Sequence, residues 1–304
     1  MAPPPTRRAL SGQAFGTLLL IALMMGANHV AARFAFNDGV DVATAVTFRS
    51  GITAIVVAAL LKLQNVPLQF SARHRKVLPA IAALVAVQSL CLYAAVARLP
   101  VALALLAFNT YPLWTALWSA LIYRQRAESM VLKAMPILLL GLALALDVFG
   151  AASGLGAAAH WNTIGAGVAF ALTAAATFGL VLILTQHEAA DVDGRLRTGT
   201  TMSMVALIAG GAALAQGGFH LPQSPSGWYG LGGLTFLYGT AFTIMFTLLP
   251  RLGVVGNSAI MNVEPVFALV MAWMLLGQTI EPVQIAGALI VVVTVMILGL
   301  RRSG

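Results

Sequence analysis

The sequence predicts an all-α polytopic membrane protein of about ten transmembrane helices, arranged as two inverted five-helix repeats. Three observations support this fold class: an apolar composition, apolar runs that cover nearly the whole chain, and an internal repeat. Of the 304 residues, 60% are hydrophobic and only 9% are charged. Because soluble domains carry about 25% charged residues, this composition is typical of a membrane protein. The single cysteine, Cys91, excludes an intramolecular disulfide and a cysteine-based metal site.

The positions of the helices follow from the length of the apolar runs, since a helix that spans the bilayer needs about 20 mostly apolar residues. Such runs predict helices near residues 14–36, 41–63, 77–97, 101–123, 130–148, 162–186, 200–217, 228–249, 254–277 and 282–300. The first run carries Asn28, His29 and Arg33 without a small-residue cleavage site. It is therefore interpreted as a retained helix and not as a signal peptide.

The internal repeat joins residues 98–125 to residues 251–278 at a constant offset, because 278 minus 125 gives 153, with no gap. The matched positions include Arg98/Arg251, Asn109/Asn262, Pro112/Pro265 and Gln125/Gln278. A weaker match of Gly16 with Gly165 extends the repeat to the first helix of each half. Each half contains an odd number of helices, so the second half enters the membrane in the opposite orientation. Inverted halves around a midplane site are the architecture of alternating-access transporters.

The loop charges predict the orientation. With the N-terminus in the cytoplasm, the outer side receives only Arg98, and the net charge of +8 reflects topology and not a nucleic-acid partner. The cytoplasmic side receives Arg7, Arg8, Lys62, Arg73, Arg75, Lys76, Arg124, Arg126, Lys133, Arg195, Arg197, Arg251, Arg301 and Arg302. We therefore predict an integral protein of the cytoplasmic (inner) membrane with both termini in the cytoplasm.

This topology divides the chain into five parts. A cytoplasmic tail (1–13) precedes the first five-helix half (14–148), and an outer loop (149–161) leads to the second half (162–300) and a short cytoplasmic tail (301–304).

Ionisable residues inside the predicted helices are the first candidates for a functional site. Glu264 is the only carboxylate placed deep in the membrane, where a charged side chain costs at least about 2.5 kcal/mol. It can bind a substrate ammonium group, carry a proton, or form a structural salt bridge to Arg49 or Arg33. Those arginines can bind a substrate carboxylate or take part in a packing or gating ion pair. His29 can respond to pH or line the bundle as a neutral, hydrogen-bonded residue.

An aromatic stripe marks the predicted fourth helix, where Tyr111, Trp114 and Trp118 stand at positions i, i+3 and i+7. Such a stripe can line a cleft for a zwitterion with a hydrophobic side chain, or it can pack against neighbouring helices. We favour the cleft for Tyr111 and Trp114 and packing for Trp118. A further aromatic candidate, Tyr238, lies in the glycine-rich stretch 227–239, whose small residues permit close helix approach.

Two matched prolines, Pro112 and Pro265, are predicted to interrupt the fourth and ninth helices. Proline removes a backbone donor, and its ring clashes with the carbonyl four residues earlier. Asn109 and Asn262 are placed to satisfy the freed backbone groups. Matched kinks predict hinges for gating, and the alternative is a static kink that shapes the bundle.

Several motifs resemble the drug/metabolite transporter superfamily, whose ten-helix members consist of two EamA-type halves. The stretch MMGANHVAARFAF is similar to the family's tryptophan-glycine-x-asparagine pattern, and the third-to-fourth-helix stretch is similar to its tyrosine-alanine, proline and basic-end pattern. The residues that carry the resemblance are Gly26, Asn28, Arg33, Arg49, Tyr93, Pro112, Arg126 and Pro265.

The sequence departs from the family at three points. Met25 replaces the usual tryptophan, and Gln125 and Gln278 stand where glutamates are often found. The first helix also lacks the carboxylate with which the four-helix multidrug relatives exchange protons for drug cations, which argues against proton-coupled cation export.

The resemblance and the aromatic fourth helix imply an exporter of amino acids, aromatic or hydrophobic ones among them, or of related small metabolites. The alternatives within the superfamily are a sugar-phosphate or nucleotide-sugar carrier and a multidrug carrier. No nucleophile–base pair and no metal-ligand spacing falls in the helices, so we predict no enzymatic activity, no metal and no cofactor. The expected partners are the solute, the lipid bilayer and, if transport is coupled, protons. The predicted substrate-binding residues are Asn28, His29, Tyr93, Asn109, Tyr111, Trp114, Tyr238, Asn262 and Glu264.

Overall fold

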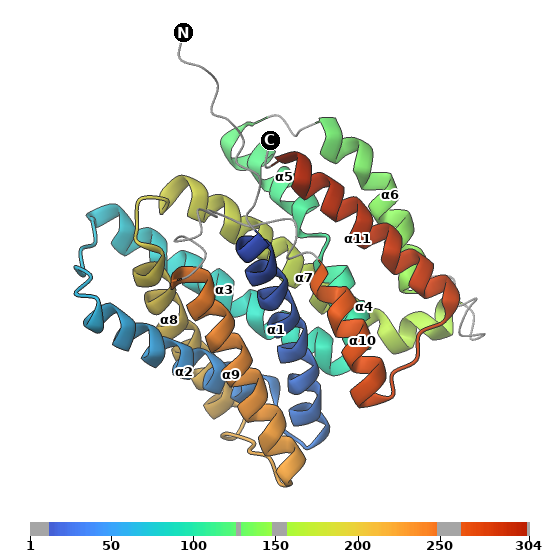
Figure 1. Cartoon of the computed structure of the whole chain (residues 1–304), viewed down its shortest axis with the longest axis horizontal. Helices are drawn as coiled ribbons and strands as arrows, with labels where there is room; N and C mark the ends of the chain where they lie inside the picture. Colours follow the sequence, from blue (N-terminus) through green and yellow to red (C-terminus); the bar gives the residue numbers. More distant parts are fainter. Residues whose placement is uncertain (1–11, 126–128, 148–156, 248–262, 303–304) are drawn as a thin grey trace.

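The computed structural model describes residues 12–125, 129–147, 157–247 and 263–302, and the regular elements among them are helices (Figure 1). They are α1 (Gly12–Asn37), α2 (Val42–Leu63), α3 (Ala72–Arg98), α4 (Val101–Phe108), α5 (Tyr111–Tyr123), α6 (Ser129–Ala145), α7 (Ala157–Glu188), α8 (Gly194–Ala215), α9 (Pro225–Thr247), α10 (Glu264–Leu276) and α11 (Pro282–Arg302).

Helix length and composition agree with a membrane protein. Within the described residues, six segments are long and apolar enough to cross a bilayer, with α4 and α5 together forming one of them. The shorter apolar helices are Lys133–Ala145, Glu264–Leu276 and Pro282–Ile297. The predicted fold class, an all-α polytopic membrane protein, is confirmed.

The contacts between helices follow the internal repeat. When each helix is replaced by its equivalent in the other half, the main contacts become other observed contacts or remain the same. Helix α1 packs against α9 and α3 against α7, which is the same contact seen from either half. Similarly, α5 packs against α7 as α10 packs against α1, while α2 contacts α8 and α6 contacts α11. Figure 1 shows α2 and α8 on one side of the molecule and α6 and α11 on the opposite side, with α1 between them. The halves therefore form a two-fold arrangement of repeats.

The predicted span over residues 101–123 is present as one apolar segment, which the structure breaks into α4 and α5. The carbonyl of Ala107 accepts hydrogen bonds from the backbone N–H of Thr110 (3.2 Å) and from the Thr110 hydroxyl (2.8 Å). Pro112 lies in the first turn of α5, where a residue needs no intrahelical N–H donor. It therefore starts a helix and does not kink the interior of one.

The second copy has the same start. Helix α10 begins at Glu264 with Pro265 in its first turn, so Pro265 likewise starts a helix. Both α5 and α10 contain 13 residues, and 264 minus 111 equals 276 minus 123, the repeat offset of 153. Residues 254–262 of the predicted ninth helix, including Asn262, lie outside the described residues.

The ends of these two helices also match. Arg124 (φ 52°) and Gly277 (φ 64°) both adopt the left-handed conformation. Their N–H groups donate to the carbonyls of Ser119 and Ala272, respectively, a common way to satisfy the last carbonyls of a helix. The repeat thus extends from side-chain identity to backbone conformation.

Two glycines correct the predicted alignment of the first helices. A Cβ on Gly26 of α1 would lie 3.1 Å from the amide nitrogen of Ala268, and one on Gly179 of α7 would lie 2.8 Å from that of Thr115. Because 179 minus 26 and 268 minus 115 both give 153, these positions are equivalent. The predicted match of Gly16 with Gly165, at an offset of 149, is therefore wrong.

Several helices begin before the predicted boundary, because polar residues outside the apolar run cap them. Ser71 and His74 form a capping box at the start of α3, and the Asp193 side chain accepts from the Arg195 amide at the start of α8. Helix α7 extends into the predicted outer loop and begins at Ala157.

Candidate functional site in the bundle

A buried polar cluster lies where the two halves meet. It contains side chains of α1, α2 and α3 from the first half and of α9 and α10 from the second. Six of its members are predicted site residues: Asn28, His29, Arg49, Tyr93, Tyr238 and Glu264. The helix pairs α1–α9 and α1–α10 bring the halves together at this point.

Tyr93 is the centre of the cluster, and its side chain is fully buried. Its hydroxyl donates to Oδ1 of Asn28 (2.8 Å) and lies 3.4 Å from Nη1 of Arg49. The ring centroid of Tyr93 lies 5.4 Å from that of His29. One phenol therefore connects the polar residues of α1 with the arginine of α2.

The guanidinium of Arg49 lies between two aromatic rings. Its central carbon is 3.8 Å from the ring centroid of Tyr238 and 4.8 Å from that of Tyr93, distances at which a cation is attracted to a ring face. Nη2 also donates to Oγ of Ser89 at 2.9 Å. The ion pairs in the described part of the chain do not include Arg49, so the alternative of a structural salt bridge between Arg49 and Glu264 is not formed.

Glu264 approaches His29. Its Oε1 lies 3.3 Å from Nε2 of His29, and the two side chains are 19% and 3% exposed. The prediction placed Glu264 about ten residues inside a helix, whereas it is the first residue of α10. A helix N-terminus carries partial positive charge and stabilises a nearby carboxylate, so this position lowers the cost of placing Glu264 in the membrane.

Among the residues that the structure describes, four polar atoms in or beside the cluster are buried without a hydrogen-bond partner: Asn28 Nδ2, His29 Nδ1, Arg49 Nε and Ser50 Oγ. An unsatisfied buried donor or acceptor costs about 1–3 kcal/mol, and native proteins contain few of them. They belong to two pairs of consecutive residues, on α1 and on α2, and Asn28, His29 and Arg49 all contact Tyr93, so hydrogen-bonding capacity for a polar ligand is left in this part of the bundle.

The sequence reasoning missed Ser50 and Ser89. Ser50 follows Arg49 directly, and Ser89 precedes Tyr93 by one helical turn on α3. Both lie in apolar runs next to predicted site residues. A search for small hydroxyl residues within one turn of a predicted site residue would have found them.

Arg33 has a different role from the one predicted. Its Nη1 donates to the carbonyls of Val96 (2.7 Å) and Leu99 (3.3 Å) at the end of α3. A cation at a helix C-terminus satisfies carbonyls that have no intrahelical partner. Arg33 therefore holds the end of α3 against α1, and the described ion pairs do not include it.

The aromatic stripe of α5 faces α7. The ring of Tyr111 lies 5.1 Å from that of Phe178, and Cβ of Trp114 is close to Gly179. Nε1 of Trp118 donates to the carbonyl of Ala176 at 2.9 Å, which agrees with the packing role expected for it. Asn109 is buried at the break between α4 and α5.

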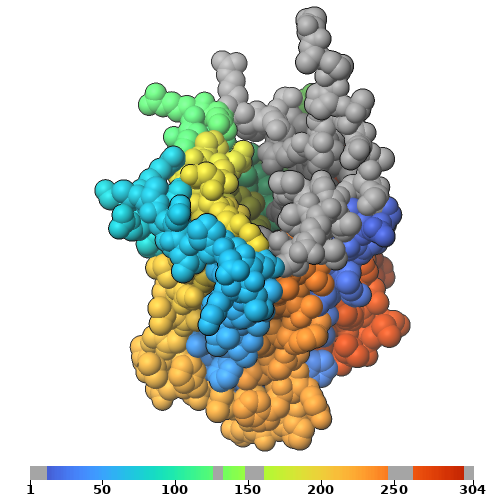
Figure 2. Space-filling view, turned by 60° about the vertical axis from the view of Figure 1, so that its left-hand side comes forward, coloured from blue at the N-terminus to red at the C-terminus, as the bar shows by residue number. Residues whose placement is uncertain are grey.

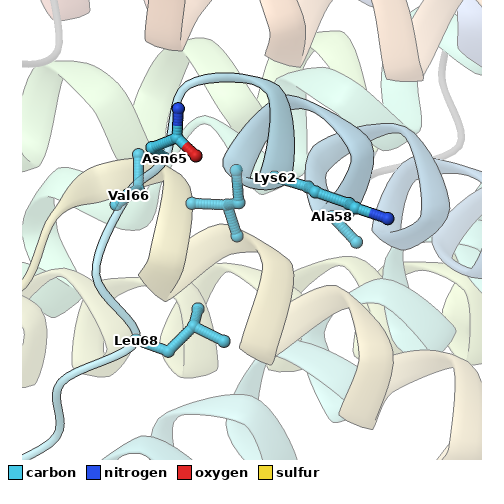
Figure 3. A pocket seen from close by; sticks show the side chains of 6 residues that line it. Ala58, Lys62, Asn65, Val66 and Leu68 are labelled. Carbon is cyan, nitrogen blue, oxygen red and sulfur yellow. The ribbon is translucent and has the colours of Figure 1, made fainter.

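Two surface grooves lie away from the cluster. One of about 690 Å³ runs between the ends of α1, α3 and α8 and includes Phe36 and Arg98. The other, of about 530 Å³, lies at the end of α2 and is lined by Lys62 and Leu68, among others (Figure 3). Residues of the polar cluster line neither groove. The ring of Phe36 meets that of Tyr93 edge-on at 6.0 Å, so one side chain separates the larger groove from the centre of the cluster.

Comparison with known proteins identifies the family of this chain. The profile of the EamA-like transporter family matches residues 13–146 and 165–300, which is most of the chain. The chain belongs to the EamA-like transporter family. A search of curated proteins gives no match. The fold is similar to that of a solved structure described as "Crystal structure of protein", with a TM-score of 0.64 and 15% identity over 97% of this chain and 100% of that one.

Membership in the EamA family makes this chain a membrane transporter of the drug/metabolite transporter superfamily, which takes a small-molecule substrate. Its helices are embedded in lipid, and members of this family are transporters and not enzymes. Groups of three or more metal-ligating side chains do not occur in the described part of this EamA protein.

Proposed function

We propose that this protein exports amino acids, with aromatic or hydrophobic ones preferred, or closely related small metabolites across the cytoplasmic membrane. The observation that carries the proposal is the buried cluster between the halves, in which Arg49 has no carboxylate partner and four polar atoms have no hydrogen-bond partner among the described residues. Buried charges in proteins are normally paired. A substrate with a free carboxylate supplies the missing anion.

The two ends of an amino acid have complementary groups in the cluster. The carboxylate binds Arg49, with Asn28 and Ser50 offering additional donors. The ammonium group binds Glu264, which then exchanges its contact with His29 for one with the substrate. The rings of Tyr93 and Tyr238 lie beside Arg49 and offer an apolar surface to the substrate side chain.

Transport follows from the two-fold arrangement of the halves. A site between inverted repeats becomes accessible from either side when the halves exchange conformations. In this proposal both termini lie in the cytoplasm, as the loop charges predict, and the segments 14–148 and 162–300 form the two halves.

The same observations disfavour a sugar-phosphate carrier. A phosphate group is normally bound by several arginines or lysines. Of the two arginines predicted within the first two helices, Arg33 already donates to the carbonyls that end α3, which leaves Arg49 alone.

Transport of labelled phenylalanine in proteoliposomes tests the proposal, with and without a pH gradient. We expect flux that unlabelled hydrophobic amino acids compete away and that phenethylamine, which lacks the carboxylate, does not. Absence of amino-acid flux, or equal competition by phenethylamine, would contradict the proposal.

A further inference from the structure

Polar residues from three helices gather at one end of the bundle, the end that the loop charges predict to be cytoplasmic. They belong to the start of α3 and the ends of α5 and α7: Arg73, Tyr123, Gln125, His187 and Glu188. Figure 2 shows the start of α3, in cyan, beside the end of α7, in yellow, at this end of the molecule.

Glu188 joins all three helices. Its Oε2 accepts from Nε (2.9 Å) and Nη2 (2.5 Å) of Arg73 on α3. Its Oε1 accepts from the hydroxyl of Tyr123 on α5 at 2.9 Å. Nη2 of Arg73 also donates to the carbonyl of His187 at 2.9 Å. One carboxylate of α7 thus ties α3 and α5 to the same point.

His187 adds a second connection between α7 and α5. Its ring stacks on that of Tyr123, with centroids 3.9 Å apart and an interplanar angle of 13°. Nδ1 lies 3.0 Å from the carbonyl of Ile183, so it donates there, and Nε2 is left to accept from Nε2 of Gln125 at 3.1 Å. The amide oxygen of Gln125 accepts from Ser119 at 2.8 Å. Both contacts suit a neutral imidazole.

The repeat shows what occupies the equivalent positions at the other end. Subtracting or adding 153 gives Leu276 for Tyr123, Phe34 for His187 and Ala35 for Glu188. Phe34 and Leu276 are apolar and pack against the same hydrophobic cluster. Gln278, the mate of Gln125, accepts instead from the backbone N–H of Val101 on α4 at 3.1 Å. The positions that form the ionic and hydrogen-bonded contact between the α5 and α7 ends therefore carry apolar side chains at the α10 and α1 ends.

A different contact is shared by both ends, which shows that the asymmetry is local. Asp38 accepts from the amides of Gln223 and Ser224 at the start of α9. Asp191, its mate since 191 minus 38 gives 153, lies 3.1 Å from His74 at the start of α3. Both ends therefore tie a loop carboxylate to the start of a helix, and they differ where α5 meets α7 and α10 meets α1.

We propose that Arg73, Tyr123, Gln125, His187 and Glu188 form a polar latch that closes the predicted cytoplasmic end, while the equivalent positions at the opposite end are apolar and form no latch. The side chains of Arg73 and Glu188 are 57% and 25% exposed, so water can replace their contacts as α5 and α7 separate. Exposed ion pairs contribute little to stability, which suits a contact that must break in every cycle. The latch regulates access to the proposed substrate site and rests on the proposed function to that extent.

Distances between spin labels test the latch without a substrate. In a Cys91→Ser background, Leu121→Cys on α5 and Gln186→Cys on α7 report on the latched end. Met274→Cys on α10, the repeat mate of Leu121, paired with Asn37→Cys at the end of α1, reports on the opposite end as the control. We expect Glu188→Gln to increase the long-distance population at the latched end roughly threefold or more and to leave the control pair unchanged.

Two further variants make the result decisive. Tyr123→Phe removes a single hydroxyl and should cause a smaller increase in the long-distance population at the latched end. This variant tests the latch if Glu188→Gln does not fold. The double exchange Arg73→Glu with Glu188→Arg should recover part of the wild-type distribution, because the ion pair forms again while the hydrogen bond from Tyr123 does not. Unchanged distances in both single variants, or equal changes at both ends, would overturn the latch. Because no substrate is present, a failure of amino-acid transport leaves this result intact and counts only against the proposed function.

Discussion

Arg49 is the residue whose surroundings say most about the substrate. Two ring faces and one serine hydroxyl surround its guanidinium, and Nε has no hydrogen-bond partner among the residues that the structure describes. Cation–π contacts contribute about 0.5–2 kcal/mol, which is less than the several kcal/mol that it costs to remove an ion from water. In the proposed function, the carboxylate of the substrate offsets the remaining cost.

Substitution of this arginine separates substrate binding from stability. Arg49→Gln should weaken amino-acid binding roughly tenfold or more, because a buried charge pair with the substrate is lost. Arg33→Gln should lower the melting temperature, since the carbonyls of Val96 and Leu99 lose their donor, but it should leave affinity near wild type. Isothermal calorimetry measures the affinity for amino acids, and thermal unfolding measures stability, so together they distinguish the role of Arg49 from that of Arg33. Equal affinity in wild type and Arg49→Gln would show that Arg49 does not bind the substrate.

Asp38 gives the protein a pH-dependent contribution to stability. Hydrogen bonds from Ser224 and from the Gln223 amide lower the pKa of its carboxyl below the ordinary value. A carboxyl with a lowered folded-state pKa stabilises the fold above its unfolded pKa, and this stabilisation is lost as the pH falls through the folded pKa. Thermal unfolding from neutral pH down to about pH 3 should therefore show a smaller loss in Asp38→Asn than in wild type. Parallel curves would contradict this assignment.

At the scale of elements, the break between α4 and α5 is the feature that sets the site apart from an ordinary bundle. Helix α4 is buried along its length from Val101 to Ala107 and contacts both α7 and α10. Because α5 starts anew at Tyr111, it can change its angle to α4 without bending a continuous helix. The same start at Glu264 gives α10 a free N-terminus next to His29.

Removal of the proline tests whether this break serves motion. Pro112→Ala supplies an N–H that can donate to the Phe108 carbonyl, so α4 and α5 can join into one continuous helix. We expect the maximal rate of flux to fall more than the affinity for substrate. The maximal rate of flux and the affinity for substrate are measured on the same preparation. An unchanged rate would show that Pro112 shapes the bundle but does not serve the motion.

The sequence predicted the helices well where apolar runs end in polar loops, and less well inside them. The α4–α5 break falls within one apolar run, and it depends on the hydrogen bonds of Thr110, which hydropathy does not register. The starts of α3 and α8 depend on capping by Ser71 and Asp193, so those helices extend beyond their apolar runs. The proline positions were predicted correctly, but as kinks and not as helix starts.

For the whole molecule, the repeat was the strongest signal, because the offset of 153 applies to helix starts, helix ends and the crossings at Gly26 and Gly179. Six predicted site residues meet in one cluster because each is a polar residue in an apolar run, where burial forces polar groups together. Ser89 and the latch could not be predicted in the same way. Their roles depend on neighbours from distant helices, and Glu188 lies just beyond the predicted helix 162–186.

Flux through the Glu264→Gln variant tests the central claim, that the cluster between the halves binds the substrate. The matched control is Glu281→Gln, which alters an exposed carboxylate just before α11. We predict that Glu264→Gln folds and reconstitutes but loses phenylalanine flux, because the ammonium group loses its anionic partner, whereas Glu281→Gln transports normally. Wild-type phenylalanine flux in folded Glu264→Gln would contradict the account.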